Sequence, residues 1–242
     1  MNEIIKSLIE RKSVRAFTDR QISSLDRELI LRAAMEAPTA GNQQMYTILD
    51  ITDQKLKDTL AETCDNQPFI AKGKMVLIFC ADFQKWYDAF VTAGINPRRP
   101  GAGDFLLAVQ DAAIAAQNAV TAAESLGIGS CYIGDIMEHY EIHRKLFKLP
   151  EFVFPALMLV FGYPTQQQRE RPKPQRASLD FIVHENTYPK FTEEDLRKNI
   201  AANTGNLDFN QWMERFCQRK YHADFSLEMS RSVEAVLKNF RE

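Results

Sequence analysis

The chain has 242 residues and a formal net charge of −2, with 45% hydrophobic and 26% charged residues. This composition is typical of a globular protein with a sizeable core, built as one large domain or as one domain with an extension. A charge so close to zero gives no overall field that would attract nucleic acid or an anionic membrane, so neither is expected as a partner.

Targeting signals and metal ligands are not evident in the sequence. No apolar run reaches the roughly 18 residues that a membrane span requires, and no signal peptide is recognisable, so we expect a cytoplasmic protein. His139 and His143 have a spacing that shares one helical face, but no third ligand accompanies them, and we predict no metal site. The cysteines are widely scattered and are expected to be buried free thiols. They are Cys64, Cys80, Cys131 and Cys217.

The first predicted elements are two helices and a strand. Apolar residues within 4–9 predict a short helix, and a serine-capped helix follows and stops at Pro38. Residues 39–44 form a polar loop. Residues 46–51 alternate weakly and favour a strand.

The middle of the chain contains the strongest pattern. Residues 75–80 are a compact apolar run typical of a buried strand. Residues 86–104 carry several glycines and prolines, which predicts an irregular, mobile loop or lid. The alanine-rich residues 106–126 predict a long helix that is apolar on nearly every face and mostly buried.

The last third is predicted to hold two strands and several helices. Residues 130–133 and 154–161 are strand candidates, with a helix at about 139–147 between them. Residues 166–176 are polar and rich in arginine. The tail from about residue 192 has the spacing of helices.

The stretch Arg11-Lys12-Ser13-Val14-Arg15 concentrates anion-binding groups at the end of the first helix. Arginine directs two N–H donors at a carboxylate or phosphate, and the serine hydroxyl adds another. A solvated basic helix end is the alternative, because positive charge is favourable near a helix C-terminus. This stretch alone does not distinguish the two interpretations. A Rossmann glycine fingerprint, a phosphate-binding loop ending in Gly-Lys-Ser/Thr and a Gly-x-Ser-x-Gly elbow are all absent from the sequence.

Seven separated motifs, read in order, resemble the FMN-dependent nitroreductase family, and most closely its NADPH-linked nitro and flavin reductase branch. The motifs occupy residues 11–17, 37–44, 67–69, 127–134, 161–164, 171–174 and 184–188. The resemblance implies an α+β fold with a central mixed sheet flanked by helices, in an intertwined homodimer. Residues 1–190 would form the FMN-binding domain, and residues 191–242 a helical extension that packs on the domain or on the partner subunit.

The resemblance also implies FMN as cofactor and NADPH or NADH as co-substrate. The cofactor-binding residues would be Arg11, Ser13, Arg15, Asn42, Gln44, Gln67, Tyr132, Ile133, Gly134, Lys173 and Arg176. Arg11 and Ser13 would hold the phosphate from one side and Lys173, with Arg176, from the other. Arg15 would lie near N1 and O2 of the ring, and the backbone N–H of Gly134 near N5.

The remaining residues have more general roles in this scheme. The amides of Asn42, Gln44 and Gln67 would line the pyrimidine or ribityl edge, Tyr132 and Ile133 would flank the ring, and Lys12 would face solvent. Two departures from the branch are evident. Gln175 separates Arg176 from Lys173-Pro174, where the branch has Lys-Pro-Arg, and Asp135 stands where a second glycine is usual.

The function implied is reduction of a small-molecule electron acceptor (a nitroaromatic, a quinone or a free flavin) by ping-pong hydride transfer. No side chain would act as a catalytic acid or base, because the cofactor carries the chemistry. Arg197 and Lys198 are candidates for the 2′-phosphate of NADPH, and residues 86–104 for the acceptor pocket. An FMN-binding carrier or sensor with little turnover is the alternative.

Overall fold

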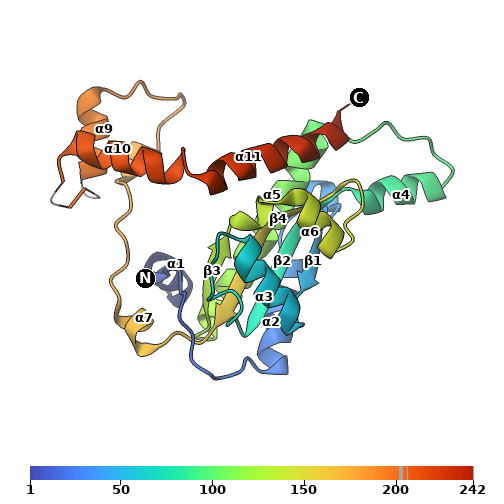
Figure 1. Cartoon of the computed structure of the whole chain (residues 1–242), viewed down its shortest axis with the longest axis horizontal. Helices are drawn as coiled ribbons and strands as arrows, with labels where there is room; N and C mark the ends of the chain where they lie inside the picture. The colour runs from blue at the N-terminus through green and yellow to red at the C-terminus, as the bar shows by residue number, and fades with distance from the viewer. Residues whose placement is uncertain (202–203, 206, 242) are drawn as a thin grey trace. The chain divides into compact units, whose positions relative to one another are not determined.

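The computed structural model describes residues 1–201, 204–205 and 207–241, and the chain divides into two compact units (Figure 1). The first unit contains Met1–Arg171 together with the chain from Glu228 onward, and the second contains Pro172–Leu227. The boundary between the units lies after Arg171, whereas the family resemblance predicted a boundary after residue 190. Among the described helices, none combines the length and the apolar character that a bilayer span requires.

The centre of the first unit is a sheet with strand order β1-β2-β4-β3. The strands are β1 (Tyr46–Asp50), β2 (Met75–Asp82), β3 (Gly129–Ile133) and β4 (Val153–Gly162). All three pairings are antiparallel, so the predicted mixed sheet is wrong for the part of the chain that the structure describes. The apolar pattern did not reveal direction, because a strand covered on both faces has the same continuous run in either type of sheet.

Helices cover both faces of this sheet. Leu77 and Phe79 of β2 point into one hydrophobic cluster, whereas Ile78 and Cys80 point into another on the opposite face. The first cluster includes α2 (Ser24–Met35) and the predicted long helix α5 (Ala102–Ser125), and the second includes α3 (Gln54–Thr63) and the 3₁₀ turn η2 (Asp135–Met137). The small alanines of α5 allow it to pack closely on the sheet.

The predicted N-terminal helices are confirmed. Asn2 caps α1 (Glu3–Glu10) by accepting a hydrogen bond from the Ile5 backbone N–H at 2.9 Å. Ser23 caps α2, and its Oγ accepts from the Asp26 N–H at 3.0 Å. The apolar side chains of α1 are all exposed, although the helix itself lies against α5.

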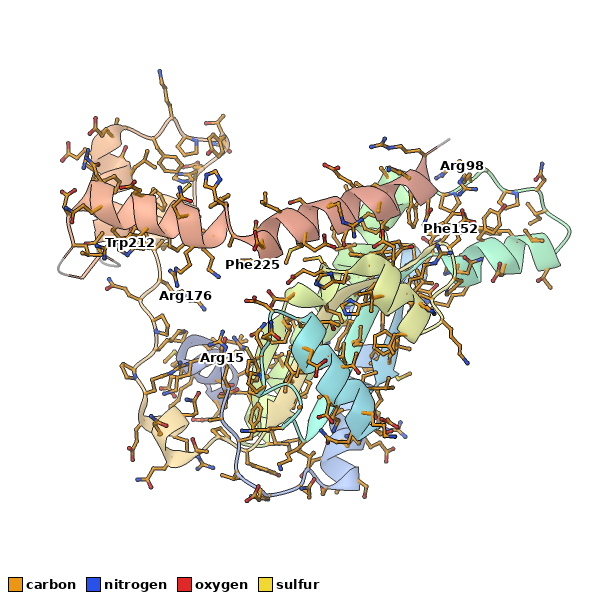
Figure 2. The ribbon with its side chains drawn as sticks, viewed as in Figure 1. Arg15, Arg98, Phe152, Arg176, Trp212 and Phe225 are labelled. Atoms are coloured by element: carbon orange, nitrogen blue, oxygen red, sulfur yellow. The ribbon has the colours of Figure 1, made fainter. Side chains whose placement is uncertain are left out.

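The prediction of an irregular loop at 86–104 is largely wrong, because α4 (Gln84–Thr92) occupies the first part of this segment. Gly94, with φ of 74°, follows the end of the helix, so the glycines and prolines come after α4 and do not interrupt it. Residues 93–101 are then held in place at the start of α5. Arg98 forms an ion pair with Asp104 at 2.6 Å, and Arg99 packs over Phe152 at 5.1 Å (Figure 2).

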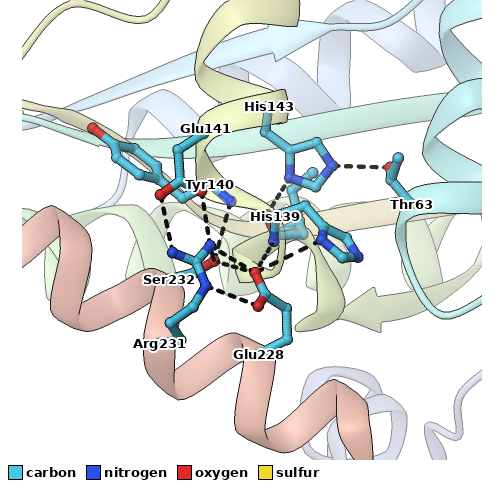
Figure 3. Close-up of polar contacts among 9 residues, drawn as sticks. Thr63, His139, Tyr140, Glu141, His143, Glu228, Arg231 and Ser232 are labelled. Atoms are coloured by element: carbon cyan, nitrogen blue, oxygen red, sulfur yellow. Dashed lines mark hydrogen bonds and ion pairs between the residues drawn. The ribbon is translucent and has the colours of Figure 1, made fainter.

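The last part of the first unit is the end of α11 (Asp224–Leu237), followed by η3 (Lys238–Phe240). Arg231 donates two hydrogen bonds to Glu141, at 2.7 and 3.0 Å, and also binds Glu228 (Figure 3). Ser232 accepts from the Tyr140 backbone N–H at 3.1 Å. These contacts anchor the end of α11 on α6 (Tyr140–Leu146), the helix predicted at 139–147.

The second unit is helical, as predicted for the tail. It contains α8 (Leu179–Ile182), α9 (Glu193–Ala201) and α10 (Phe209–Lys220), and Phe181 of α8 contacts Phe191 with ring centroids 4.7 Å apart. Trp212 and Phe216 stack with ring centroids 4.7 Å apart. The short helix α7 (Gln166–Glu170) belongs to the first unit.

All four cysteines are free thiols, as predicted. Cys64, Cys80 and Cys131 are buried in the first unit, whereas Cys217 in the second is half-buried. Burial raises the pKa of Cys64 and Cys131, and it raises that of Cys80 to about 12. These three thiols are therefore protonated at neutral pH.

Candidate functional site

The basic stretch from Arg11 to Arg15 runs along β3. The Val14 backbone N–H donates to the Ser130 carbonyl at 2.9 Å, and Arg11 Nη2 lies 3.4 Å from Ser130 Oγ. The side chains of Ser13 and Arg15 both contact the Cys131 thiol. The structure therefore places Arg11 and Ser13, which were predicted to bind the phosphate, along the same strand as Arg15, which was predicted to lie near the ring.

Two glycines make this close docking possible. A Cβ on Gly129 would lie 2.6 Å from Val14 Cγ2, and a Cβ on Gly162 would lie 2.7 Å from the ring of Phe17. Real Cβ atoms do not tolerate such contacts. The small size of these two residues thus fixes how close the stretch lies to the sheet.

Lys12 does not face solvent, so that prediction is wrong. Its Nζ donates to the carbonyl of Arg169 at 2.6 Å and to that of Arg171. Arg171 in turn donates from Nη2 to the Ser13 carbonyl at 2.7 Å. The sequence could not show these contacts, because the partners are more than 150 residues away and are backbone atoms. They fasten the basic stretch to the end of α7.

Arg11 has a buried donor that is not used. Its Nε is inaccessible to solvent and has no hydrogen-bond partner among the described residues. Glu124 of α5 is near enough to feel the charge of Arg11, but burial dominates and raises the pKa of that carboxyl. A buried guanidinium N–H without a partner is costly, so this donor is suited to an acceptor that arrives from outside the chain.

The two β3 residues predicted to flank a ligand differ in exposure. Burial raises the pKa of Tyr132 to about 12 despite the nearby Arg11, so its hydroxyl is neutral, and it donates to Gln117 Oε1 at 3.2 Å. The side chain of Ile133 is 1% exposed and packs in the cluster on the α3 face. Ile133 can therefore offer a ligand only its main chain.

Asn42 and Gln44 lie in one tight loop that includes the 3₁₀ turn η1 (Ala40–Asn42). Both residues have left-handed backbone angles, with φ of 57° and 50°, as does Gly41 between Ala40 and Asn42. Gln44 Nε2 donates to Asn42 Oδ1 at 3.0 Å. A backbone in this region is unfavourable for residues other than glycine, so the surroundings must hold the loop in this shape.

Asp111 of α5 holds this loop, and sequence reasoning missed it. One carboxylate oxygen accepts from the Ala40 N–H at 3.0 Å and the other from the Met45 N–H at 3.1 Å. Asp111 is 2% exposed. The available signal was a single acidic residue on the buried face of an alanine-rich helix. Trp86 of α4 adds a hydrogen bond from Nε1 to the Gln43 carbonyl at 2.7 Å.

Gln67, in the connection between α3 and β2, contacts Asp135, the residue that follows Gly134 after the end of β3. Its Nε2 donates to Asp135 Oδ2 and to the Cys64 carbonyl, both at 3.0 Å. Gly134 has φ of −77° and ψ of −25°, which any residue adopts, and a Cβ there would meet only Met137 Cε at 4.0 Å. Neither backbone shape nor packing requires glycine, so the open space in front of it remains for a ligand.

The other predicted cations lie in the second unit. Lys173 is half-buried and Arg176 is exposed, and their pairing with Arg11 and Ser13 stays a prediction. Arg197 binds Glu193 at 2.8 Å and packs over Phe209. The predicted site residues thus fall into four groups. These are the β3 stretch, the 42–44 loop, the Gln67–Gly134 corner and the second unit.

Comparison with known proteins identifies the family. A model described as "Nitroreductase family" matches residues 8–163. The "Oxygen-insensitive NADPH nitroreductase" of Salmonella typhimurium is 34% identical over 198 residues, which are 82% of this chain and 80% of that protein. The "FMN reductase (NADPH)" of Bacillus subtilis is 31% identical over 197 residues, covering 80% of this chain and 78% of that protein.

A solved structure extends the likeness to the fold. The structure of B. megaterium NfrA2 superimposes with a TM-score of 0.87 at 27% identity, covering 99% of this chain and 98% of that one. The match thus includes the helical segments that follow the region of the family model. The chain belongs to the nitroreductase family and is an oxidoreductase of the NAD(P)H-dependent FMN/nitroreductase type.

Proposed function

We propose that the protein binds FMN and uses NADPH or NADH to reduce a nitroaromatic, a quinone or a free flavin in a ping-pong reaction. The observation that carries the proposal is the docking of Arg11, Ser13 and Arg15 on β3. A phosphate dianion needs several cationic and hydroxyl donors at one end of its site, and this strand presents them together.

The residues present fit this cofactor. The unused buried donor of Arg11 is suited to a phosphate oxygen, and the open space at Gly134 lets a flat ring approach the backbone. When bound, FMN supplies the hydride chemistry. The chain's own residues bind and orient it, and no side chain needs to act as an acid or base.

Each group of residues has a role in this proposal. Arg11 and Ser13 hold the phosphate in this proposal, and Lys173 and Arg176 are assigned to the phosphate by the family resemblance alone. Arg15 stabilises negative charge that develops near N1 and O2 of the ring, because a preorganised cation there lowers its energy. Further contacts come from Asn42, Gln44, Gln67, Tyr132 and the main chain of Ile133.

An anaerobic titration tests the proposal. The purified protein is saturated with FMN, freed of excess, and titrated with NADPH and with NADH while the flavin absorbance is recorded. We expect one equivalent of a nicotinamide to bleach the flavin and a quinone or nitroaromatic to restore the colour. Failure to retain FMN would overturn the proposal, and retained FMN that no nicotinamide bleaches would favour the carrier or sensor.

We also propose a homodimer built on the exposed faces of α1 and α5, which pack against each other. The apolar side chains exposed on these two helices are Ile4, Ile5, Leu8, Ile9, Leu106, Leu107 and Ile114. Water-exposed apolar surface of this extent is typical of an interface. Sedimentation velocity should give a dimer, and Ile114→Glu should shift it toward monomer. The charge change Lys55→Glu, on α3 across the sheet, should leave the dimer intact. A monomeric unmodified protein would contradict the proposal.

A further inference from the structure

A further arginine side chain contacts the basic stretch at Ser13. Arg171 directly follows α7 and belongs to the same unit as residues 11–15. Its Nη2 donates to the Ser13 carbonyl at 2.7 Å, and its own carbonyl accepts a hydrogen bond from Lys12 Nζ. Because each segment donates to the main chain of the other, the guanidinium of Arg171 is held beside Ser13.

The guanidinium of Arg171 has a donor that the described chain does not use. Its Nε is inaccessible to solvent and has no hydrogen-bond partner among the residues that the structure describes. Nε belongs to the same planar group as Nη2, so it also lies near the Ser13 main chain. Arg11, two residues before Ser13, has an unused buried Nε as well. Buried N–H groups without acceptors are costly, and two of them near one serine suit a ligand with several acceptor oxygens.

These cations are not neutralised by carboxylates. Within the described part of the chain, none of Arg11, Lys12, Arg15 and Arg171 forms an ion pair with a carboxylate at 4.0 Å or less. Glu124 is near enough to interact with the charges of Arg11 and Lys12, but burial raises the pKa of that carboxyl, which makes it a poor counter-ion. Partly buried charges are normally paired, so this cluster favours an anion that comes from outside the chain.

We propose that Arg171 is a phosphate-binding residue of the cofactor site, which holds the Ser13 main chain with Nη2 and donates to a phosphate oxygen from Nε. A guanidinium suits both tasks, because its donors are fixed in one plane and one of them is already anchored. A hydrogen bond between a guanidinium and a phosphate is charge-assisted and therefore strong. The inference rests on the proposed function for the identity of the ligand as FMN, whereas the anion site itself does not.

A comparison of FMN with riboflavin, which has the same ring but no phosphate, tests the proposal. Both dissociation constants are measured by flavin fluorescence quenching. Arg171→Met removes the donors and keeps an unbranched side chain, and we expect it to bind FMN about 10- to 100-fold more weakly and riboflavin unchanged. Arg171→Lys keeps the charge and should recover part of the FMN affinity. Arg169→Met, which removes an exposed arginine from α7, should bind both flavins like the unmodified protein.

A second measurement does not depend on a flavin. Calorimetric titration of the full chain with inorganic phosphate should show binding that Arg171→Met weakens. The proposal is overturned if Arg171→Met keeps full FMN affinity, or if it loses FMN and riboflavin affinity equally, because an equal loss indicates a purely structural role. Phosphate that does not bind, or that binds both proteins equally, would also overturn it. If the unmodified protein binds neither flavin, the proposed function fails, and the phosphate titration still decides whether Arg171 binds the anion.

Discussion

Gly129 and Gly162 are partners in the β3–β4 register, and both pack against the chain that carries Arg11 to Phe17 along β3. One clears space for Val14 and the other for Phe17. The position of the cationic side chains therefore depends on two residues that have no functional group. Substitutions there should disturb the site without changing its chemistry.

Gly162→Ala should lower both stability and FMN affinity. The new Cβ would lie 2.7 Å from the Phe17 ring, and overpacking of this kind costs about 1 to 3 kcal/mol. Thermal unfolding and flavin titration measure the two effects. Gly103→Ala, in α5 with nothing within 4 Å of the added Cβ, is the matched control and should be neutral or slightly stabilising. Equal behaviour of the two variants would contradict the packing argument.

Arg11 and Arg15 should differ in what they contribute. Arg11→Ala removes a partly buried charged donor and should weaken FMN binding by about 10- to 100-fold, the effect of a hydrogen bond to a charged group. Arg15→Ala should lower the rate of flavin reduction more than the affinity. Stopped-flow reduction and flavin titration separate the two quantities. Arg32→Ala, an exposed arginine on α2, should change neither. Similar losses of both quantities in both site variants would refute this division.

Asp111→Asn should loosen the loop that contains Asn42 and Gln44. An amide offers only one acceptor oxygen, so one of the two backbone N–H groups would lose its partner, at a cost of about 1 to 3 kcal/mol. FMN affinity should fall together with stability. Asp58→Asn makes the same chemical change on the exposed side of α3 and should have little effect. Unchanged FMN affinity in Asp111→Asn would show that the loop keeps its shape without this carboxylate.

Arg231→Gln should weaken the anchor of α11 in a pH-dependent way. Hydrogen bonding to Arg231 is the main cause that lowers the pKa of Glu228 to about 2, so the stabilisation is present above the ordinary value of 4.5 and is lost as the pH falls toward 2. The difference in melting temperature between variant and unmodified protein should be largest near neutral pH and shrink over that window. Arg197→Gln removes an exposed pair on α9 and should matter little. A difference that grows with acidity would exclude the linkage.

The sequence predicted those parts of the fold whose pattern is local. Strands β2 and β4 are continuous apolar runs, and α5 is a long alanine-rich segment, so all three were predicted with nearly correct bounds. The strand directions were not, because direction depends on connections that no periodicity records. Helix α4 was not predicted, because the glycines and prolines that follow it in the same segment are typical of a loop.

The site was predictable only as far as the family resemblance extended. Arg11, Ser13 and Arg15 alternate in the sequence and the structure places them along β3, while their roles toward a cofactor stay predictions. Asp111 and the contacts of Lys12 were not foreseeable, because a buried carboxylate or ammonium that binds backbone atoms leaves no spacing signal between the partners. Each of these groups holds a loop in place.

The burial of three thiols has a practical consequence for a redox protein. Thiolates, and not thiols, react with oxidants and alkylating reagents, and burial keeps Cys64, Cys80 and Cys131 protonated. The buried thiols of the first unit should therefore resist oxidants and alkylating reagents. Cys217, half-buried in the second unit, is then the cysteine that a maleimide dye should label first. A dye at this position would report on the second unit without any change to the sequence.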